Sequence, residues 1–416
     1  MPNPITWIRS LFTKYVVTVE SNQAIIQSVR HKQNLRNQDF ITRRLTPPAM
    51  KTNLAVDVRF DPYLDIAISP HELLHAMGII TTPSVPNLAK LSATWAIIRY
   101  VWAFAPSLGN ANQPLQLSTE ARRIDFHQKN LLSDEVGMAM GYYVMTHYFG
   151  TPFWVDVKEA LDDQTWNLSQ LGKAMPDYIF FNDSFSTAYV VECKGNQTSF
   201  DSSCDQIRRG TEQVVSILFK SGRTISCMII ATYLAKDGTF TYIIDPPSGK
   251  DGNTDYHFPE SSERIYKLKD DDSFISDARS ISASQLLAYA GFWDEAISIS
   301  PKKKSIKSKD IIPQRSRRIM EIEKFPFSGS YETHSTHDGN TIEIFTGLLS
   351  PLYQKITESK DPINRSLELP VPYMERFLVT ENGHKRTGGF VHGSDLEKFE
   401  TWSICSNGTA FHIKIT

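Results

Sequence analysis

The chain has 416 residues, of which 41% are hydrophobic and 22% charged, and its formal net charge is −2. These values are ordinary for a folded protein of two or three domains, and they exclude a chain whose overall charge attracts nucleic acid. Four cysteines without a Cys-x-x-Cys pair are too few for a disulfide scaffold, which is typical of a reducing cytoplasm.

Residues 1–117 contain helix patterns interrupted by proline clusters, and they predict a mainly helical N-terminal region for recognition or assembly. The most apolar window, residues 91–109, carries Arg99 in its middle and Pro106 near its end, which favours a buried helix over a membrane span. Residues 1–17 have charges within their apolar run and lack a small-residue cleavage pattern, so they do not resemble a signal peptide. We therefore expect a cytoplasmic protein without membrane contact.

Residues 118–300 alternate helix and strand patterns, which is typical of an α/β domain. A helix is predicted from Ser118, which is followed by an acid in the first turn. Further helix patterns cover residues 133–149, 204–220 and 282–299, and strand-like runs cover 152–157, 176–181, 187–194, 226–234 and 239–245.

The last third of the chain differs from this domain. Residues 301–318 hold eight Lys or Arg residues against the single acid Asp310, a local charge of +7, and residues 301–319 are predicted to form an exposed basic linker. Residues 320–416 alternate short strand-like runs with Gly and Pro turns. They predict a C-terminal α+β region, to which the sequence assigns no role.

Two predicted strands carry charged residues where a buried strand should be apolar. Alternate side chains of a strand share a face, so Glu192 and Lys194 lie together and Cys193 lies opposite. The preceding strand begins at Asp177, and residues 182–187 between the two strands have the composition of a hairpin turn. Pairing brings Asp177 beside Glu192, and two adjacent carboxylates repel unless a cation lies between them. Because Mg²⁺ prefers such oxygen ligands, a metal site is predicted at an edge of the sheet.

The order Pro176-Asp177, hairpin, Glu192-Cys193-Lys194 resembles the PD-(D/E)xK phosphodiesterases, the superfamily of the restriction-endonuclease-like fold. The resemblance covers roughly residues 120–250. It implies an α/β nuclease domain over residues 118–300, with a mixed central sheet flanked by helices. It also implies that Asp177, Glu192 and the backbone carbonyl of Cys193 hold Mg²⁺, which Mn²⁺ can replace. Lys194 would position or deprotonate the attacking water and offset developing charge.

The same resemblance extends to the flanking helices. Glu135, in the predicted helix 133–149, would complete the first metal site or hold a second ion. Gln206, in the helix after the second strand, would lie near the scissile phosphate, and Arg208, Arg209 and Gln213 are weaker candidates for that role. Neither glutamine begins the Gln-x-x-x-Tyr motif of helicase-linked exonucleases, so an endonuclease is favoured.

The expected function is therefore a Mg²⁺-dependent endonuclease that cuts DNA in preference to RNA. The large flanking regions resemble those of prokaryotic restriction and antiphage defence nucleases, so partner proteins of such a system are expected. Many members of the superfamily cut duplexes as dimers, so a homodimer is one possible assembly, which the sequence neither indicates nor excludes. The alternative is a non-catalytic nuclease fold that scaffolds a defence or repair complex, although a scaffold has no need for mutually repelling carboxylates.

A second motif competes with this interpretation. His71-Glu72-Leu73-Leu74-His75 matches the His-Glu-x-x-His of zinc metallopeptidases, in which two His rings share a helix face and the Glu acts as base. Pro70 predicts that the helix begins there, and Thr81 stands where the extended metallopeptidase pattern needs a third His. We therefore expect a helix start capped by Ser69, with Glu72 favoured by the helix dipole, and the zinc peptidase is the less favoured alternative.

Overall fold

The computed structural model describes residues 9–47, 54–82, 99–104, 111–162, 168–170, 174–185, 188–219, 225–244, 272–300, 317–335, 339, 341–358, 367–381 and 384–416. Among the described residues, no helix has both the length and the apolar character that a membrane span needs. The predicted basic linker lies mostly outside this set, since of its residues only 317–319 are described, where they begin a strand.

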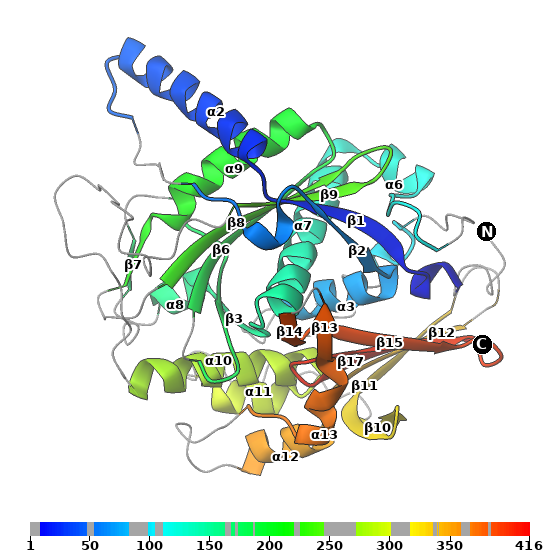
Figure 1. Cartoon of the computed structure of the whole chain (residues 1–416). Coiled ribbons are helices and arrows are strands. Elements are labelled where there is room, and N and C mark those ends of the chain that lie inside the picture. Colours follow the sequence, from blue (N-terminus) through cyan, green and yellow to red (C-terminus); the bar gives the residue numbers. More distant parts are fainter. Residues whose placement is uncertain are drawn as a thin grey trace.

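A seven-stranded mixed sheet forms the centre of the molecule, in the strand order β2-β1-β9-β8-β6-β5-β3 (Figure 1). Two neighbouring pairs, β1–β9 and β6–β8, are parallel, and the other four pairs are antiparallel. The strands are β1 (Tyr15–Glu20), β2 (Leu64–Ile68), β3 (Phe153–Asp156), β5 (Tyr178–Phe181), β6 (Ala188–Asn196), β8 (Ile225–Leu234) and β9 (Thr239–Ile244). The predicted α/β class and the mixed central sheet flanked by helices are confirmed.

Two strands of this sheet come from the N-terminal region. In β1 the side chains of Tyr15, Val17 and Val19 are buried and the residues between them are half-buried, which is the alternation of a strand with one face on the core. The expected boundary at residue 117 therefore does not separate two sheets: β1 and β2 join the strands of the central region in one sheet.

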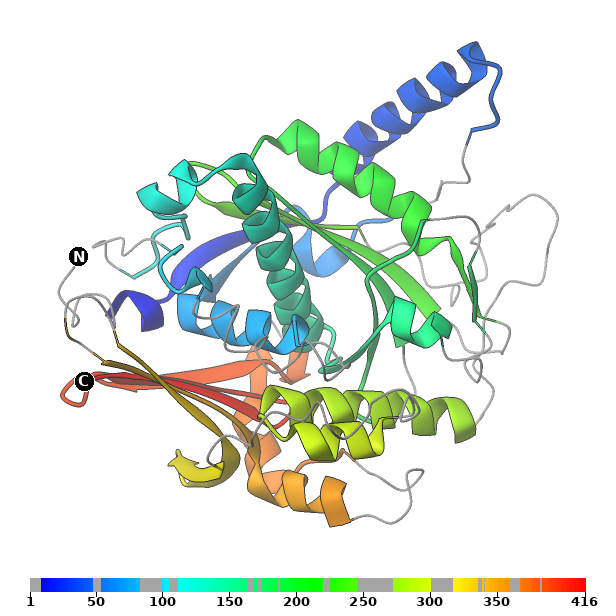
Figure 2. The same cartoon turned by 180° about the vertical axis from the view of Figure 1, so that it is seen from behind.

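Helices cover both faces of the sheet (Figures 1 and 2). On one face lies α7 (Phe126–Tyr148), whose glycines contact β6; on the other lies α9 (Phe200–Val214), which carries α2 (Gln23–Thr42) on its outer side. The remaining helices are α3 (Pro70–Ile80), α6 (Thr119–Arg123), α8 (Val157–Asp162), α10 (Asp272–Tyr289), α11 (Trp293–Ile299), α12 (Ser350–Glu358) and α13 (Val371–Met374).

Helix boundaries differ from the sequence prediction at three places. The helix predicted from Ser118 stops after Arg123, and α7 then runs without a break, because Asp125 caps the backbone N–H groups of His127 and Gln128. The helix predicted over 204–220 ends at Val214, and β7 (Ile217–Phe219) follows and pairs with β4 (Leu168–Gln170). The closing helix is divided at Gly291, whose φ of +85° favours glycine.

The C-terminal region forms a second, six-stranded antiparallel sheet in the order β10-β11-β12-β17-β16-β15. Its strands are β10 (Arg317–Ile322), β11 (Phe325–Ser335), β12 (Thr341–Leu349), β15 (Phe390–Asp395), β16 (Glu400–Cys405) and β17 (Thr409–Ile415), and β13 (Leu378–Glu381) pairs with β14 (His384–Thr387) separately. Helix α3 contacts both α7 and this sheet, so it joins the two halves of the molecule. The predicted strand-containing C-terminal region is confirmed.

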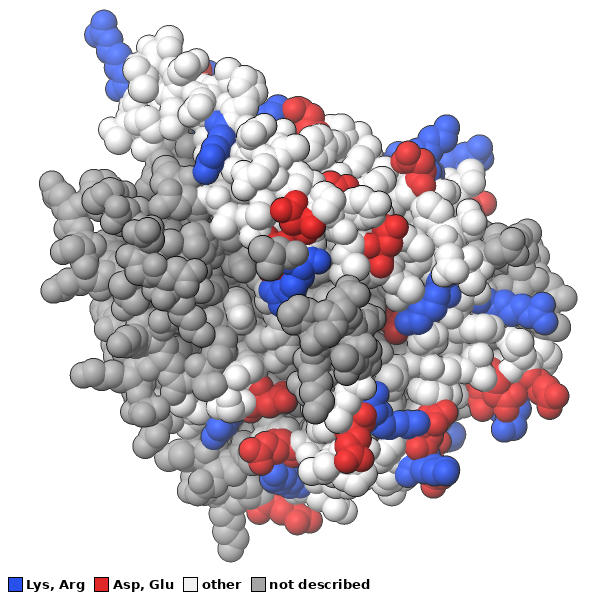
Figure 3. All heavy atoms as spheres, in the orientation of Figure 1, with Lys and Arg blue, Asp and Glu red and all other residues white. Residues whose placement is uncertain are grey.

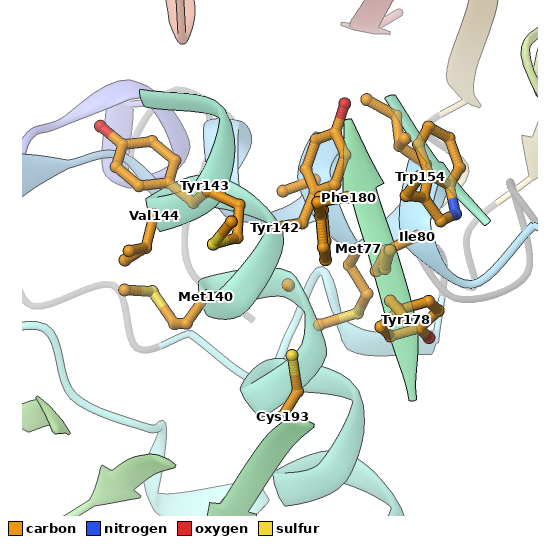
Figure 4. Close-up of a cluster of buried hydrophobic side chains, with 14 of the residues drawn as sticks. Met77, Ile80, Met140, Tyr142, Tyr143, Val144, Trp154, Tyr178, Phe180 and Cys193 are labelled. Carbon is orange, nitrogen blue, oxygen red and sulfur yellow. The ribbon is translucent and has the colours of Figure 1, made fainter. Parts of the chain in front are cut away.

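The core between α3, α7 and the strands β3 and β5 is built from large side chains (Figure 4). Met77 from α3, Tyr142 from α7 and Trp154 from β3 are each at most 1% exposed. Burying a side chain of this size stabilises the fold by roughly 1.5–3 kcal/mol. This packing fixes the position of α7 against the strands that carry the candidate site.

Neither sign of charge dominates among the described residues on the face shown in Figure 3. Lys and Arg side chains are interspersed with Asp and Glu on the face shown in Figure 3. This mixture agrees with the near-zero net charge, so binding of a polyanion would require a local site.

Candidate active site

The pairing of β5 with β6 brings the charged residues of the motif together. The two strands are antiparallel, with Tyr178 opposite Val191, which places Asp177 opposite Glu192. Opposite residues of a pair share a face of the sheet, so Asp177, Glu192 and Lys194 lie on the side covered by α9. The predicted hairpin and the predicted neighbourhood of the two carboxylates are confirmed.

An ion pair joins two of the three side chains, and a backbone hydrogen bond holds the third. The ammonium group of Lys194 forms an ion pair with Oε1 of Glu192, which is completely buried, whereas Lys194 is 22% exposed. Asp177 accepts a hydrogen bond of 2.9 Å from the backbone N–H of Cys193. The Cys193 side chain lies on the opposite face, against Gly141 of α7, as the strand alternation predicts.

The pKa values of the three groups reflect their burial and mutual proximity. Burial, and then the neighbouring Asp177, raise the pKa of Glu192 to about 8, and Lys194 opposes this shift. Burial also raises the pKa of Asp177, against the influence of Lys194 and the Cys193 hydrogen bond. Burial alone would lower the pKa of Lys194, but Glu192 and Asp177 together raise it. A positive charge at this place is therefore strongly favoured.

The two carboxylates fit one side of a divalent cation site. Oε2 of Glu192 is buried and has no hydrogen-bond partner, which leaves a lone pair free for a cation. Carboxylates are the ligands that Mg²⁺ prefers. In the described part of the chain, however, no group of three or more His, Cys, Asp or Glu side chains is arranged to hold a metal ion. Asp177 and Glu192 therefore provide two ligands, and a third must come from the backbone, from solvent or from substrate.

Glu135, the acid expected from the first core helix, is turned away from these carboxylates. Gly137 of α7 faces β6, since a Cβ atom on it would lie 2.6 Å from the carbonyl oxygen of Lys194. Glu135 is two residues from Gly137 and therefore on another side of the helix. Burial raises the pKa of Glu135, while Tyr100 and Arg99 oppose the shift. The surroundings of Glu135 are thus Tyr100 and Arg99 rather than Asp177 and Glu192.

Of the two neighbouring acids of α7, Asp134 is the one whose pKa is influenced by the charge of Lys194. Burial raises its pKa, and the charge of Lys194 lowers it, so the two groups interact electrostatically. Glu135 was predicted as a metal ligand because many members of the superfamily that the sequence resembles carry a Glu in this helix. The glycine spacing at 137 and 141 is the signal that defines the face toward β6 and favours Asp134.

Gln206 and Gln213 lie at different points along β6. Gln206 donates to the carbonyl oxygen of Gly195 at 3.0 Å and accepts from Asn196 at 3.1 Å, so it is fixed beyond the carboxylates, at the strand end. Gln213 favours the ionised form of Glu192 and donates to the carbonyl oxygen of Met175 at 2.7 Å. Gln213, the weaker sequence candidate, is therefore the glutamine nearest to the acidic pair.

The two arginines of α9 are already paired. Arg208 is 2% exposed and bridges Asp205, at 2.9 Å, and Glu212, at 2.6 Å. Arg209 is exposed and pairs with Asp205 at 2.7 Å. Arg208 therefore connects turns of α9, and only Arg209 is accessible to an external phosphate.

Helix α9 closes over the site. A Cβ atom on Gly210 would lie 3.4 Å from Cγ of Glu192 and 2.9 Å from Cγ2 of Ile229, so only glycine allows this approach. Strand β6 lies between β5 and β8 in the interior of the sheet. The predicted position at an edge of the sheet is therefore wrong: the carboxylates lie on an inner strand, beneath a helix.

The competing His-Glu-x-x-His motif forms a structural junction. Ser69 caps α3, and the Glu72 carboxylate accepts a hydrogen bond of 2.8 Å from the backbone N–H of Ser69, which confirms the predicted capped helix start. His71 approaches the carbonyl oxygen of Phe411 at 3.2 Å. His75 contacts Ser403 at 2.7 Å through Nδ1 and Thr409 at 3.1 Å through Nε2. Both nitrogens of His75 are thus engaged by the C-terminal sheet, which argues against zinc binding.

Comparisons of the chain with protein-family models, with curated proteins and with solved structures find no match. The functional assignment therefore depends on the geometry of the site.

Proposed function

We propose that the protein is a Mg²⁺-dependent phosphodiesterase, an endonuclease acting on DNA. The observation that supports the proposal is the convergence of Asp177, Glu192 and Lys194 on one face of β5 and β6, with a buried Glu192 oxygen that lacks a hydrogen-bond partner. Buried carboxylates with raised pKa values are unfavourable for the fold by themselves, and such groups concentrate at functional sites.

Each residue has a specific task in this proposal. Asp177 and Glu192 hold the divalent cation, with the Cys193 carbonyl as the backbone ligand and Mn²⁺ as an alternative metal. A divalent cation at such a site supplies neutralisation of phosphate charge and a lowered pKa of bound water. Lys194 keeps its proton because of its acidic neighbours, so it stabilises negative charge that develops on the phosphate.

Neighbouring residues prepare this site. Gln213 stabilises the ionised form of Glu192, and Gly210 lets α9 approach closely enough to exclude water from the Glu192 side chain. In a site of low polarity, the interaction of Lys194 with a phosphate is stronger than it would be in bulk water. The same proposal includes four wider predictions: a role in restriction or antiphage defence, partner proteins, a homodimer and a cytoplasmic location.

A non-catalytic role is the second candidate, because one observation favours it. Lys194 already neutralises Glu192 within the protein, and among the described residues no third acidic ligand joins the group. A scaffold would keep this ion pair as a structural contact and would not need a metal ion.

The test is cleavage of plasmid DNA with Mg²⁺, Mn²⁺ or EDTA by the purified protein and by Asp177→Ala. We expect nicked or linear DNA with either metal, none with EDTA, and none with the variant. Asp395→Ala is the matched control, since Asp395 is partly exposed on β15 of the other sheet and pairs with Lys398. Equal cleavage by Asp177→Ala and by the unchanged protein would reject the proposal, and absence of cleavage with every metal would favour the scaffold.

A further inference from the structure

A groove of about 1020 Å³ opens at the end of β6 that follows Lys194. Its walls are the beginning of α7, the beginning of α9 and the turn between β8 and β9, and Lys32 of α2 borders it. These elements lie near one another at one end of the sheet, where β6 leads into α9 (Figure 2). Its volume is at the upper end of the roughly 300–1,000 Å³ of small-molecule pockets, so it has room for more than one linked unit.

Hydrogen bonds fix the floor of the groove. Asn196 donates to Ser203 at 2.8 Å and to Gln206 at 3.1 Å, and Gln206 donates to the carbonyl oxygen of Gly195 at 3.0 Å. Gln197 donates to Ser133 at 3.0 Å, which ties the floor to α7. The groove is therefore a built feature with a polar base, and Gln206 belongs to this base.

The charged residues of the walls are more basic than acidic. The basic ones are Lys32, Arg122, Lys129, Arg209 and Lys236, and the acidic ones are Asp134, Asp201 and Asp205. Lys32 pairs with Asp201 at 2.7 Å, and Arg209 pairs with Asp205. These pairs satisfy two of the three acids and leave an excess of positive charge.

Two lysines carry this excess. In the described part of the chain, the ammonium groups of Lys129 and Lys236 have neither an ion pair nor a hydrogen bond with protein. Lys129 stands on α7 and Lys236 on the opposite wall, in the turn between β8 and β9. Both ammonium groups are therefore available to an anionic ligand in the groove.

An exposed aromatic ring stands at the same groove. Phe126, the first residue of α7, lines the groove and is 71% exposed; its ring has an edge contact with His127, at 6.0 Å between the ring centroids. An apolar ring in water is unfavourable unless a partner covers it. The combination of a cationic groove and a free aromatic face is the arrangement that binds unpaired nucleic acid, because every base can stack and every phosphate is anionic.

We infer that this groove binds a single-stranded nucleic-acid segment, with Phe126 stacking on a base and Lys129 and Lys236 contacting phosphates. The inference rests on the proposed function and specifies the form of its substrate. Gly195 and Asn196, the two residues that follow Lys194 in β6, line the groove, so the groove begins directly after the candidate site along this strand. A duplex keeps its bases paired and offers no free face to Phe126, so a frayed, looped or displaced strand is the expected ligand.

The test measures binding of a labelled oligothymidylate by fluorescence anisotropy in EDTA, with Lys194→Ala as the background protein so that cleavage cannot interfere. Unlabelled duplex DNA and thymidine monophosphate serve as competitors. We expect Phe126→Ala to weaken binding about tenfold without changing the salt dependence, and Phe126→Trp to restore it. We expect Lys129→Ala and Lys236→Ala each to reduce the slope of log K against log salt by about 0.7.

Lys355→Ala is the matched control, because this exposed helical lysine lies on α12, at the other end of the molecule (Figure 1). It should leave affinity and salt slope unchanged. Failure to bind the oligomer would overturn the inference, as would unchanged binding by the Phe126 and lysine variants or equal competition by duplex or by the mononucleotide. Binding that depends on these residues, in a protein that cuts nothing with Mg²⁺, would uphold the groove and reject the nuclease proposal.

Discussion

The ammonium group of Lys194 is ion-paired with the carboxylate of Glu192, a side chain with no exposed surface. Breaking a buried pair by removing one partner leaves the other charge without compensation. Asp177 lies in the same group and adds a second negative charge. The lysine therefore has two tasks in the proposed enzyme: it makes the acidic pair tolerable before a cation binds, and it faces the phosphate afterwards.

Lys194→Ala should reduce the rate of cleavage by about 100-fold or more, because the variant lacks the positive charge that acts on both Asp177 and Glu192. Glu192 should then bind a proton, so the variant should still fold, as circular dichroism can show. Lys355→Ala, which removes one exposed charge, should cut plasmid normally. A fully active Lys194→Ala protein would contradict the assignment.

In the Glu192→Gln variant, the melting temperature should no longer depend on Mg²⁺. The substitution removes a carboxylate that burial disfavours, so the variant in EDTA at pH 8 should melt at the same temperature or higher. Mg²⁺ should raise the melting temperature of the unchanged protein, since it binds only the folded state, and should not raise that of the variant. Glu321→Gln, at an exposed position of β10, should keep the Mg²⁺ effect. An undiminished Mg²⁺ shift in Glu192→Gln would show that the ion binds elsewhere.

Asp134→Asn and Glu135→Gln form a matched pair on adjacent residues of α7. Asp134 interacts with Lys194, whereas Glu135 is surrounded by Tyr100 and Arg99. We expect Asp134→Asn to reduce the rate of cleavage about tenfold or more and Glu135→Gln to change it less than twofold. The reverse order of rates would restore Glu135 as the helix acid of the site.

Gly141 and Cys193 test the contact that fixes α7 on β6. A Cβ atom on Gly141 would lie 2.4 Å from Sγ of Cys193 and 3.6 Å from its Cβ. Gly141→Ala should therefore destabilise the protein by roughly 1–3 kcal/mol through overpacking. Cys193→Ala removes the clashing sulfur, so the double variant should recover stability relative to Gly141→Ala, with a coupling of about 0.5–3 kcal/mol in urea unfolding. Strictly additive effects would mean that the two residues do not touch.

Acid should destabilise the junction between α3 and the C-terminal sheet. Burial lowers the pKa of His71 from 6.5 to about 3, so the unfolded chain binds this proton more readily than the folded protein does. The contribution of neutral His71 to stability is complete above about pH 6.5 and is lost as the pH falls toward 3, by at most about 1.4 kcal/mol per pH unit. His71→Phe should reduce this slope in urea titrations from pH 7 to 5, and His31→Phe, at an exposed position of α2, should not. An unchanged slope would show that His71 does not titrate on unfolding.

Local sequence patterns predicted much of the candidate site. The alternation of β6 places Glu192 and Lys194 on one face because successive side chains of any strand point to opposite sides. The capping of α3 by Ser69 was also predictable, since it requires only residues within one helical turn. The same alternation is present in β1, where Tyr15, Val17 and Val19 mark the buried face, and it was hidden by the helical character of the surrounding region.

Contacts between distant segments decided the rest. The sequence by itself determined that two acids and a lysine would meet on paired strands, because hairpin pairing and strand alternation are properties of the local backbone. Only the tertiary structure decided that β6 is an inner strand, that α9 closes over it, and that Asp134 of α7, rather than Glu135, is influenced by the charge of Lys194. The rotation of a helix about its axis depends on close packing against a strand about 60 residues further along the chain, and no local pattern specifies that contact.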